Sequence, residues 1–198
     1  MIVIAVLNQK GGSGKTTIAT HLARALQLMF DGQSVVLVDS DPQGSARDFA
    51  AATEEQPLMV VGLDRAASLG RDVRKLNADF VVIDGAPQAA ELAAAALVAA
   101  DLVLIPVQPS PYDIWATADL VALVKQRQEI TDGKLKAAFV ISRLIKGTVI
   151  GSEIRDVLAG YELPVLDSSG DPAARAEIKE LAAEAIAFIE GVTEGVSA

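Results

Sequence analysis

The chain has 198 residues, of which 51% are apolar and 22% are charged, so a disordered protein is excluded and one ordinary domain is expected. It contains no cysteine, which excludes disulfides, thiolate metal sites and a cysteine nucleophile. Its net charge of −9 argues against nucleic-acid binding, because a DNA-binding domain is usually basic.

The N-terminus lacks the basic start and the cleavage site of a secretory signal. No apolar run approaches the roughly 20 residues that a membrane-spanning helix needs. Together with the absence of cysteine, these features make a cytoplasmic location the simplest interpretation.

Short β-branched runs alternate with longer helical patterns along the chain. Several of the short runs are apolar at successive positions, which is typical of strands buried on both faces of a parallel sheet. We expect strands at 2–7, 34–40, 58–62, 80–84, 102–107, 137–142 and, weakly, 163–166. We expect helices near 16–30, 43–53, 65–76, 88–98, 113–130, 150–160 and 172–190.

This alternation predicts a doubly wound α/β fold, with a mainly parallel sheet and helices on both faces. One domain spans residues 1–198. The last helix has the clearest pattern, with Asp171 as N-cap and Pro172 in its first turn. Its apolar stripe consists of Ile178, Leu181, Ala182, Ala185 and Ile189.

The segment NQKGGSGKTT, residues 8–17, follows the first strand and opens the first helix. It is a variant of the phosphate-binding loop GxxxxGK[ST], with Gln9 in place of the first glycine. The backbone of Gly11, Gly12, Ser13 and Gly14 would cradle phosphates at a helix N-terminus. Lys15 would neutralise the β- and γ-phosphates, Thr16 would hold Mg²⁺, and Thr17 could reach a phosphate.

Three acids follow other strands. Asp39 and Asp41 end the second, and Asp84 ends FVVID. Because the carboxyl ends of parallel strands face the ligand crevice, all three acids can face one nucleotide. Asp84 after four apolar residues is typical of a Walker-B acid that holds Mg²⁺.

The boxes KGGSGKTT, LVDSDPQGSA and VVIDGAP, in this order, resemble those of the ParA-type ATPases, which have a deviant Walker box and partition plasmids and other large cargo. The resemblance extends over residues 1–160 and includes LIPVQPSPYDIWA, residues 104–116. It implies that Lys10 reaches across a dimer interface to the nucleotide of the other subunit, so that ATP joins two subunits and hydrolysis releases them.

The resemblance also assigns roles to the acids: Asp41 positions the attacking water, Asp39 supports the magnesium shell, and Asp84 binds Mg²⁺ or its water. It favours ATP, and the sequence has no NKxD element of the type that reads guanine. The base would lie near residues 106–111 and near Ser142 and Arg143, although these two residues could equally be a simple strand terminus.

Other conspicuous residues have simpler explanations. His21 is expected to be an ordinary residue of the first helix. Trp115 is expected to pack in a helix with Ile114 and Ala118, with a role at the dimer face or near switch elements as the alternative. Arg71, Arg74 and Lys75 are expected to form a solvated helix face.

ParA-type proteins usually carry a basic segment where this chain passes directly from Leu166 to Asp167. Either the segment has been lost or residues are missing from the sequence at this point, and we favour missing residues. Residues 134–198 contain 7 Lys and Arg against 10 Asp and Glu. Non-specific DNA binding is therefore implied by the resemblance alone, with Arg143, Lys146, Arg155 and Lys179 as candidates.

The favoured function is an ATPase switch for DNA partition that forms an ATP-dependent homodimer, binds non-specific DNA and associates with the nucleoid. No helix-turn-helix precedes the phosphate loop, so a centromere-binding or adaptor partner would recognise the cargo. A plasmid is the expected cargo, with a chromosome origin or a protein organelle as alternatives.

Two other functions compete with this one. A MinD-like ATPase that positions itself on membranes would need a basic amphipathic tail, but AFIEGVTEGVSA has two glutamates and no Lys or Arg. A small-molecule ATP-dependent enzyme of the same superfamily is the other. An iron–sulfur reductase of that superfamily is excluded because the chain lacks cysteine.

Overall fold

The computed structural model describes residues 1–51, 58–142, 149–168 and 175–191, without the side chains of 149–152 and 175–176. Six parallel strands form one sheet in the order β3-β2-β4-β1-β5-β6. The strands are β1 (Ile2–Val6), β2 (Val35–Asp39), β3 (Met59–Gly62), β4 (Phe80–Asp84), β5 (Leu102–Val107) and β6 (Lys136–Ile141). The parallel sheet predicted from the sequence is confirmed.

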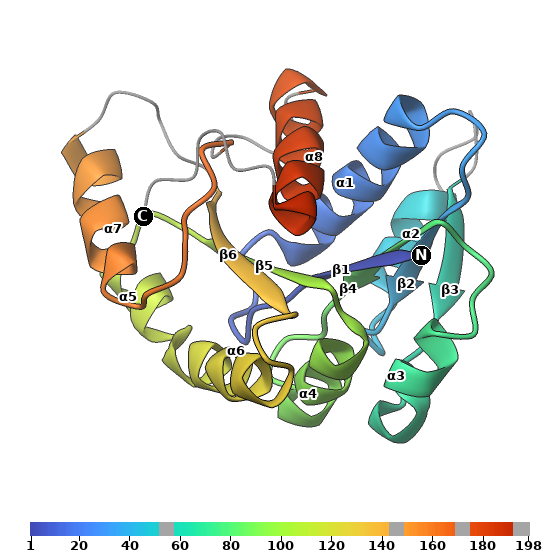
Figure 1. The fold of residues 1–198 in the computed structure, drawn as a ribbon, viewed down its shortest axis with the longest axis horizontal. Coiled ribbons are helices and arrows are strands. Elements are labelled where there is room, and N and C mark those ends of the chain that lie inside the picture. Colours follow the sequence, from blue (N-terminus) through green and yellow to red (C-terminus); the bar gives the residue numbers. More distant parts are fainter. Residues whose placement is uncertain (52–57, 143–148, 169–174, 192–198) are drawn as a thin grey trace.

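Helices cover both faces of the sheet (Figure 1). They are α1 (Lys15–Met29), α2 (Ser45–Ala51), α3 (Ala66–Val73), α4 (Ala90–Ala99), α5 (Pro111–Trp115), α6 (Ala118–Ile130), α7 (Val149–Ala159) and α8 (Arg175–Glu190). The core against one face includes residues of α1, α2 and α8, and the core against the other includes residues of α3 to α7. None of the helices in the described ranges is long and apolar enough to cross a membrane.

The uninterrupted apolar runs of the strands follow from this layering. In β1, Ile4 and Val6 enter the core beside α1 and α8, whereas Val3 and Ala5 enter the opposite core. Successive residues of a strand point to opposite faces, and here both faces are covered. Each strand residue is therefore buried whichever way it points.

Small residues let the helices pack closely. The alanine run at 93–96 lies on α4, and Ala96 is fully buried. On the neighbouring α3, a Cβ added at Gly70 would lie 3.2 Å from the carbonyl oxygen of Ala95. Ala93 and Ala96 therefore form a packed face of the helix.

Two expected elements differ from prediction. The single helix expected at 113–130 is two helices, α5 and α6, separated by Ala116 and Thr117. The buried hydroxyl of Thr117 donates a 2.6 Å hydrogen bond to the carbonyl of Ile114 at this break. Residues 163–166 form no named strand: they make an isolated bridge between Phe139 and Val165 at the open edge of β6.

The final helix confirms its predicted face. Of the stripe residues, Ile178, Leu181, Ala182 and Ala185 are buried and Ile189 is half-buried. The predicted cap at Asp171 and Pro172 lies outside the described residues. The chain is continuous through Leu166, whose amide donates to the carbonyl of Phe139. Nothing in these contacts tests the predicted missing segment after Leu166, which stays a prediction. The assignment of residues 1–198 to a single domain also stays a prediction.

Candidate nucleotide site

The phosphate loop lies at the carboxyl end of β1, in the centre of the sheet. It leads directly into α1, which begins at Lys15 with Gly14 as its N-cap. Gly12 and Gly14 have φ angles of 75° and 95°, a left-handed conformation that glycine adopts without steric cost. The glycines at these positions therefore allow the turn that exposes the N-terminus of α1 to a ligand.

Side chains from three strand ends hold the loop in place. Asn8 donates to the carbonyl of Pro106 at 2.7 Å and accepts the amide of Lys10 at 2.8 Å. The amide group of Gln108 donates to the carbonyl of Gly12 at 2.7 Å. The hydroxyl of Ser142 donates to the carbonyl of Ser13 at 3.1 Å. Ser142, which was predicted near the base, thus contacts the phosphate loop.

The loop opens into a cavity of about 290 Å³ that it shares with Asp41. The cavity is lined by Gly11, Gly12, Gly14, Lys15, Thr16, Thr17, Asp41, Ser45 and Pro87. Most of the predicted phosphate-binding residues thus meet one predicted catalytic acid in one space.

Lys15 is buried, and its ammonium group donates to the carbonyl of Lys10 at 2.9 Å. Burial lowers the pKa of Lys15, while the charges of Asp84 and Asp41 act to raise it. The lysine is therefore held beside both acids at the start of α1.

Asp84 is fully buried, and among the described residues neither of its carboxylate oxygens has a hydrogen-bond partner. Burial raises its pKa to about 7, with a further rise from the Asp39 charge, while the nearby Thr16 side chain and the Lys15 charge oppose the rise. A buried carboxylate without a partner is costly, and a divalent cation is a ligand that such oxygens prefer. Asp84 with the adjacent Thr16 hydroxyl therefore fits a Mg²⁺ ion.

Asp39 is paired in register with Asp84 across β2 and β4 but has different contacts. Its carboxylate accepts the backbone amides of Asp41 and Arg47, both at 3.1 Å, and forms an ion pair with Arg47 at 3.3 Å. These contacts all belong to the turn that carries Asp41.

Lys10 has an acidic partner within its own subunit. Its ammonium group contacts Asp113 on α5, whose side chain is 4% exposed, whereas that of Lys10 is 43% exposed. Asp113 belongs to the segment LIPVQPSPYDIWA, in which the sequence assigned no role to this aspartate.

The profile of the family described as the CobQ/CobB/MinD/ParA nucleotide binding domain matches residues 4–172. The chain belongs to this family. The predicted relationship to ParA-type proteins and the assignment as a P-loop ATPase are thereby confirmed. The chain is also 30% identical to maintenance of carboxysome distribution protein A of Halothiobacillus neapolitanus over 196 residues, which covers 96% of this chain and 85% of that protein.

A second relative is the chromosome-partitioning ATPase Soj of Thermus thermophilus, with 28% identity over 80% of this chain and 76% of that protein. Among solved structures, cobyrinic acid a,c-diamide synthase from Mycobacterium smegmatis with bound ATP analog and magnesium has a TM-score of 0.80. The alignment covers 98% of each chain at 22% identity, which establishes a shared fold.

The residues for which the sequence analysis expected no site role lie in three different environments. The His21 ring nitrogen lies 2.7 Å from the carbonyl of Thr17, one turn earlier on α1, as expected of a helix residue. Arg71, Arg74 and Lys75 are exposed, as predicted. The prediction that Trp115 packs is wrong: it is 64% exposed, because α5 is a short separate helix that buries Asp113 and Ile114 instead.

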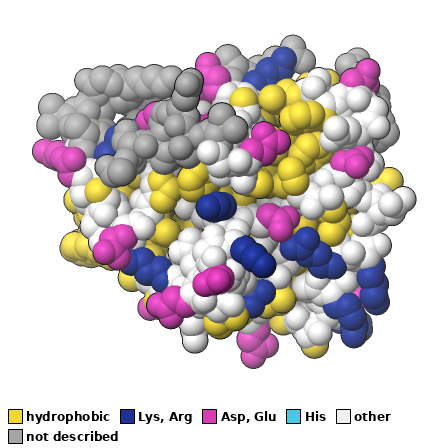
Figure 2. Space-filling model, in the orientation of Figure 1, with side chains coloured by type: hydrophobic (Ala, Val, Ile, Leu, Met, Phe, Trp, Pro, Cys, Tyr) yellow, Lys and Arg dark blue, Asp and Glu magenta, His cyan; other side chains and the backbone are white. Residues whose placement is uncertain are grey.

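Two of the four candidate DNA-binding residues lie in the described part of the chain. Arg143 and Lys146 lie outside the described residues. Arg155 pairs with Asp167, and Lys179 is exposed on α8. On the face shown in Figure 2, basic and acidic side chains are interspersed.

Four residues at this site were missed by sequence reasoning: Asn8, Arg47, Gln108 and Asp113. Gln108 and Asp113 lie in a segment that carried the family resemblance, so a signal existed. Nothing in the sequence pointed to Arg47.

Proposed function

We propose that this protein is an ATP-driven positioning switch of the ParA type, which dimerises around Mg-ATP and acts with a cargo-bound partner. The observation that carries the proposal is the cavity in which the phosphate loop meets Asp41, with the partnerless carboxylate of Asp84 beside it. A P-loop, a water-positioning acid and a metal-binding acid are the parts that phosphoryl transfer to water needs.

The residues divide the work by their positions. Backbone amides of Gly11, Gly12, Ser13 and Gly14 and the ammonium of Lys15 would bind the phosphates, with Thr17 at the cavity wall. Thr16 and Asp84 would hold Mg²⁺, which when bound neutralises phosphate charge. Asp41 would orient the attacking water, and Asp39 would support the magnesium site from the turn it organises.

Lys10 would complete the site of the partner subunit. Its side chain is half-exposed, and in the structure it contacts buried Asp113 of its own subunit. In the dimer, the phosphates of the partner's ATP would replace Asp113 as the counter-charge. ATP would therefore hold two acidic subunits together, and hydrolysis would release them.

ATP is the proposed nucleotide, and its base would lie near residues 106–111, Ser142 and Arg143. Relatives named as an ATPase and as partition proteins support this choice. The proposal also includes a partner protein that recognises the cargo. It further includes non-specific DNA binding by the dimer and a cytoplasmic, nucleoid-associated location.

The names of the relatives point to two cargo classes, a chromosome and a protein organelle. A chromosome, an alternative from the sequence, has support from the Thermus thermophilus Soj, which aligns over 76% of its length. The plasmid expected from the sequence is implied by the ParA-type resemblance. A protein organelle has support from the Halothiobacillus neapolitanus protein, which aligns over 85% of its length. The greater coverage favours an organelle as cargo.

The proposal is tested by following phosphate release from Mg-ATP and retention on a non-specific DNA fragment at increasing salt. We expect slow hydrolysis, DNA retention with ATP but not ADP, and a steep loss of retention with salt. Lys15→Ala should abolish hydrolysis, with the exposed Lys75→Ala as the matched control. Hydrolysis without nucleotide-dependent DNA retention would contradict the DNA-based switch and favour a small-molecule enzyme.

A further inference from the structure

The side chain of Arg47, on α2, folds back onto the turn that carries Asp41. Its Nε lies 3.3 Å from the buried carboxylate of Asp39, and its Nη2 donates to the carbonyl of Asp41 at 3.3 Å. The amide of Asp41 in turn donates to the other carboxylate oxygen of Asp39. The backbone of Asp41 is therefore held on both sides, by Asp39 at its N–H and by Arg47 at its C=O.

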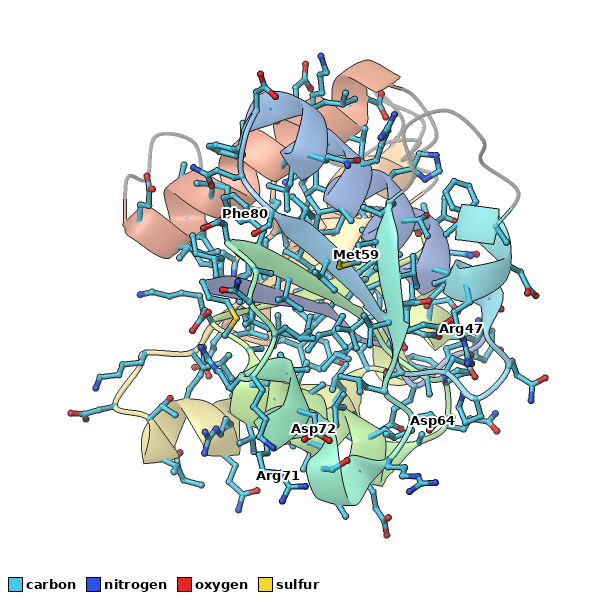
Figure 3. The ribbon with its side chains drawn as sticks, turned by 90° about the vertical axis from the view of Figure 1, so that its right-hand side faces the viewer. Arg47, Met59, Asp64, Arg71, Asp72 and Phe80 are labelled. Carbon is cyan, nitrogen blue, oxygen red and sulfur yellow. The ribbon has the colours of Figure 1, made fainter. Side chains whose placement is uncertain are left out.

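Two glycines from different elements leave the space that Arg47 fills. A Cβ at Gly44 would lie 3.0 Å from Nη2, and a Cβ at Gly62 would lie 3.0 Å from Nη1. Gly62 ends β3, and Figure 3 shows Arg47 next to that end of the strand. The guanidinium is thus enclosed on two sides although 43% of the side chain is exposed.

We propose that Arg47 is a positioning residue for ATP hydrolysis, acting through Asp39 and the Asp41 carbonyl to hold the Asp41 carboxylate in the cavity that faces the phosphate loop. This role rests on the proposed ATPase function. A planar guanidinium can engage a carboxylate and a carbonyl at the same time, whereas a lysine ammonium is a point charge. The fork geometry is therefore required, as well as the positive charge.

Arg47 does not line the cavity, so its loss should leave nucleotide binding intact. The acid that it holds does line the cavity, so the loss should slow the chemical step. A displacement of about 1 Å in a catalytic geometry can lower a rate by up to about a hundredfold. We expect Arg47→Ala and Arg47→Lys each to lower kcat about tenfold with KM for ATP unchanged.

Gly62→Ala provides an independent test, because it displaces the guanidinium without removing its charge. The three heavy atoms nearest to the added Cβ all belong to Arg47, and Gly62 has no positive φ that would strain an alanine. We expect Gly62→Ala to lower kcat severalfold in the wild-type background and to have no further effect on Arg47→Ala. The control is Arg71→Ala, since Arg71 is exposed on α3 and pairs only with Asp72 among the described contacts.

Steady-state phosphate release gives kcat and KM for the wild type, the four single variants and the Gly62→Ala/Arg47→Ala double variant, with circular dichroism to confirm folding. If Arg47→Ala does not fold, Arg47→Lys and Gly62→Ala carry the test. A drop in kcat at constant KM, with Gly62→Ala silent in the Arg47→Ala background, supports the role. If the wild type hydrolyses ATP and the Arg47 variants have the same kcat, the positioning role of Arg47 is wrong but the proposed ATPase function stands. The same holds if the effects of Gly62→Ala and Arg47→Ala on kcat are additive. A wild-type chain that releases no phosphate overturns the proposed function as well.

Discussion

Asp84 is a carboxylate whose burial conflicts with its charge. Burial raises its pKa to about 7, so the folded protein binds a proton here that the unfolded chain releases near its ordinary pKa of 3.8. For a raised pKa, the contribution to stability is present below pH 4 and is lost as the pH rises through 7. The nucleotide-free protein should therefore become less stable over this range because of Asp84.

Asp84→Asn should remove this pH dependence. Each pKa unit corresponds to about 1.4 kcal/mol, so relative to wild type the variant should gain on the order of 3 kcal/mol in free energy of unfolding between pH 4 and pH 8. Urea unfolding of the nucleotide-free proteins at both pH values measures the difference. Asp64→Asn, at an exposed position, serves as control. An equal change in the free energy of unfolding of Asp84→Asn at both pH values would show that the charge of Asp84 does not destabilise the folded protein.

The sequence predicted the residues of the phosphate loop and the three acids, because motifs place them at the ends of strands. It did not predict Asp113 beside Lys10 or Gly62 beside Arg47, because these contacts join residues far apart in the chain. Trp115 was mispredicted for a related reason. Its apolar character predicted packing, whereas the break between α5 and α6 leaves it exposed.

The phosphate loop is an element whose shape depends on its neighbours. Gln108 follows β5, and the side chain of this half-buried residue donates one hydrogen bond to the carbonyl of Gly12. Gln108→Ala should therefore loosen the loop without disturbing the core. A net hydrogen bond contributes about 1 kcal/mol, which corresponds to roughly fivefold weaker ATP binding.

Titration with a fluorescent ATP analogue measures this effect, and thermal unfolding checks that the midpoint is unchanged. Gln33→Ala is the matched control, because Gln33 is an exposed glutamine just before β2. A nucleotide affinity equal to that of wild type would mean that the loop holds its shape without Gln108.

Among the elements, the strands that are apolar at successive positions were predicted well, since burial on both faces produces that pattern. Residues 163–166 have the same apolar character, yet they contribute one bridge at the edge of β6. The sequence pattern reports burial, and Leu163, Val165 and Leu166 are indeed buried. It does not report whether a neighbouring strand completes the pairing.

At the scale of the whole molecule, the alternation of elements predicted a doubly wound sheet but not the order of its strands. The order decides the site: β1, β4 and β2 are adjacent, so the phosphate loop, Asp84 and Asp39 lie side by side. The sequence could place these residues only at one edge of a sheet. Their register, with Asp39 opposite Asp84, comes from the fold.

The central claim is that ATP joins two chains through Lys10, and solution mass tests it most directly. Light scattering after size exclusion would compare Asp41→Ala in Mg-ATP and in Mg-ADP with Lys10→Ala/Asp41→Ala, because without Asp41 hydrolysis cannot erase the ATP state. We predict twice the 20.6 kDa chain mass for Asp41→Ala in ATP and a single chain mass in ADP, with the double variant monomeric in both. The same mass in both nucleotides, or a dimer that forms without Lys10, would contradict the account.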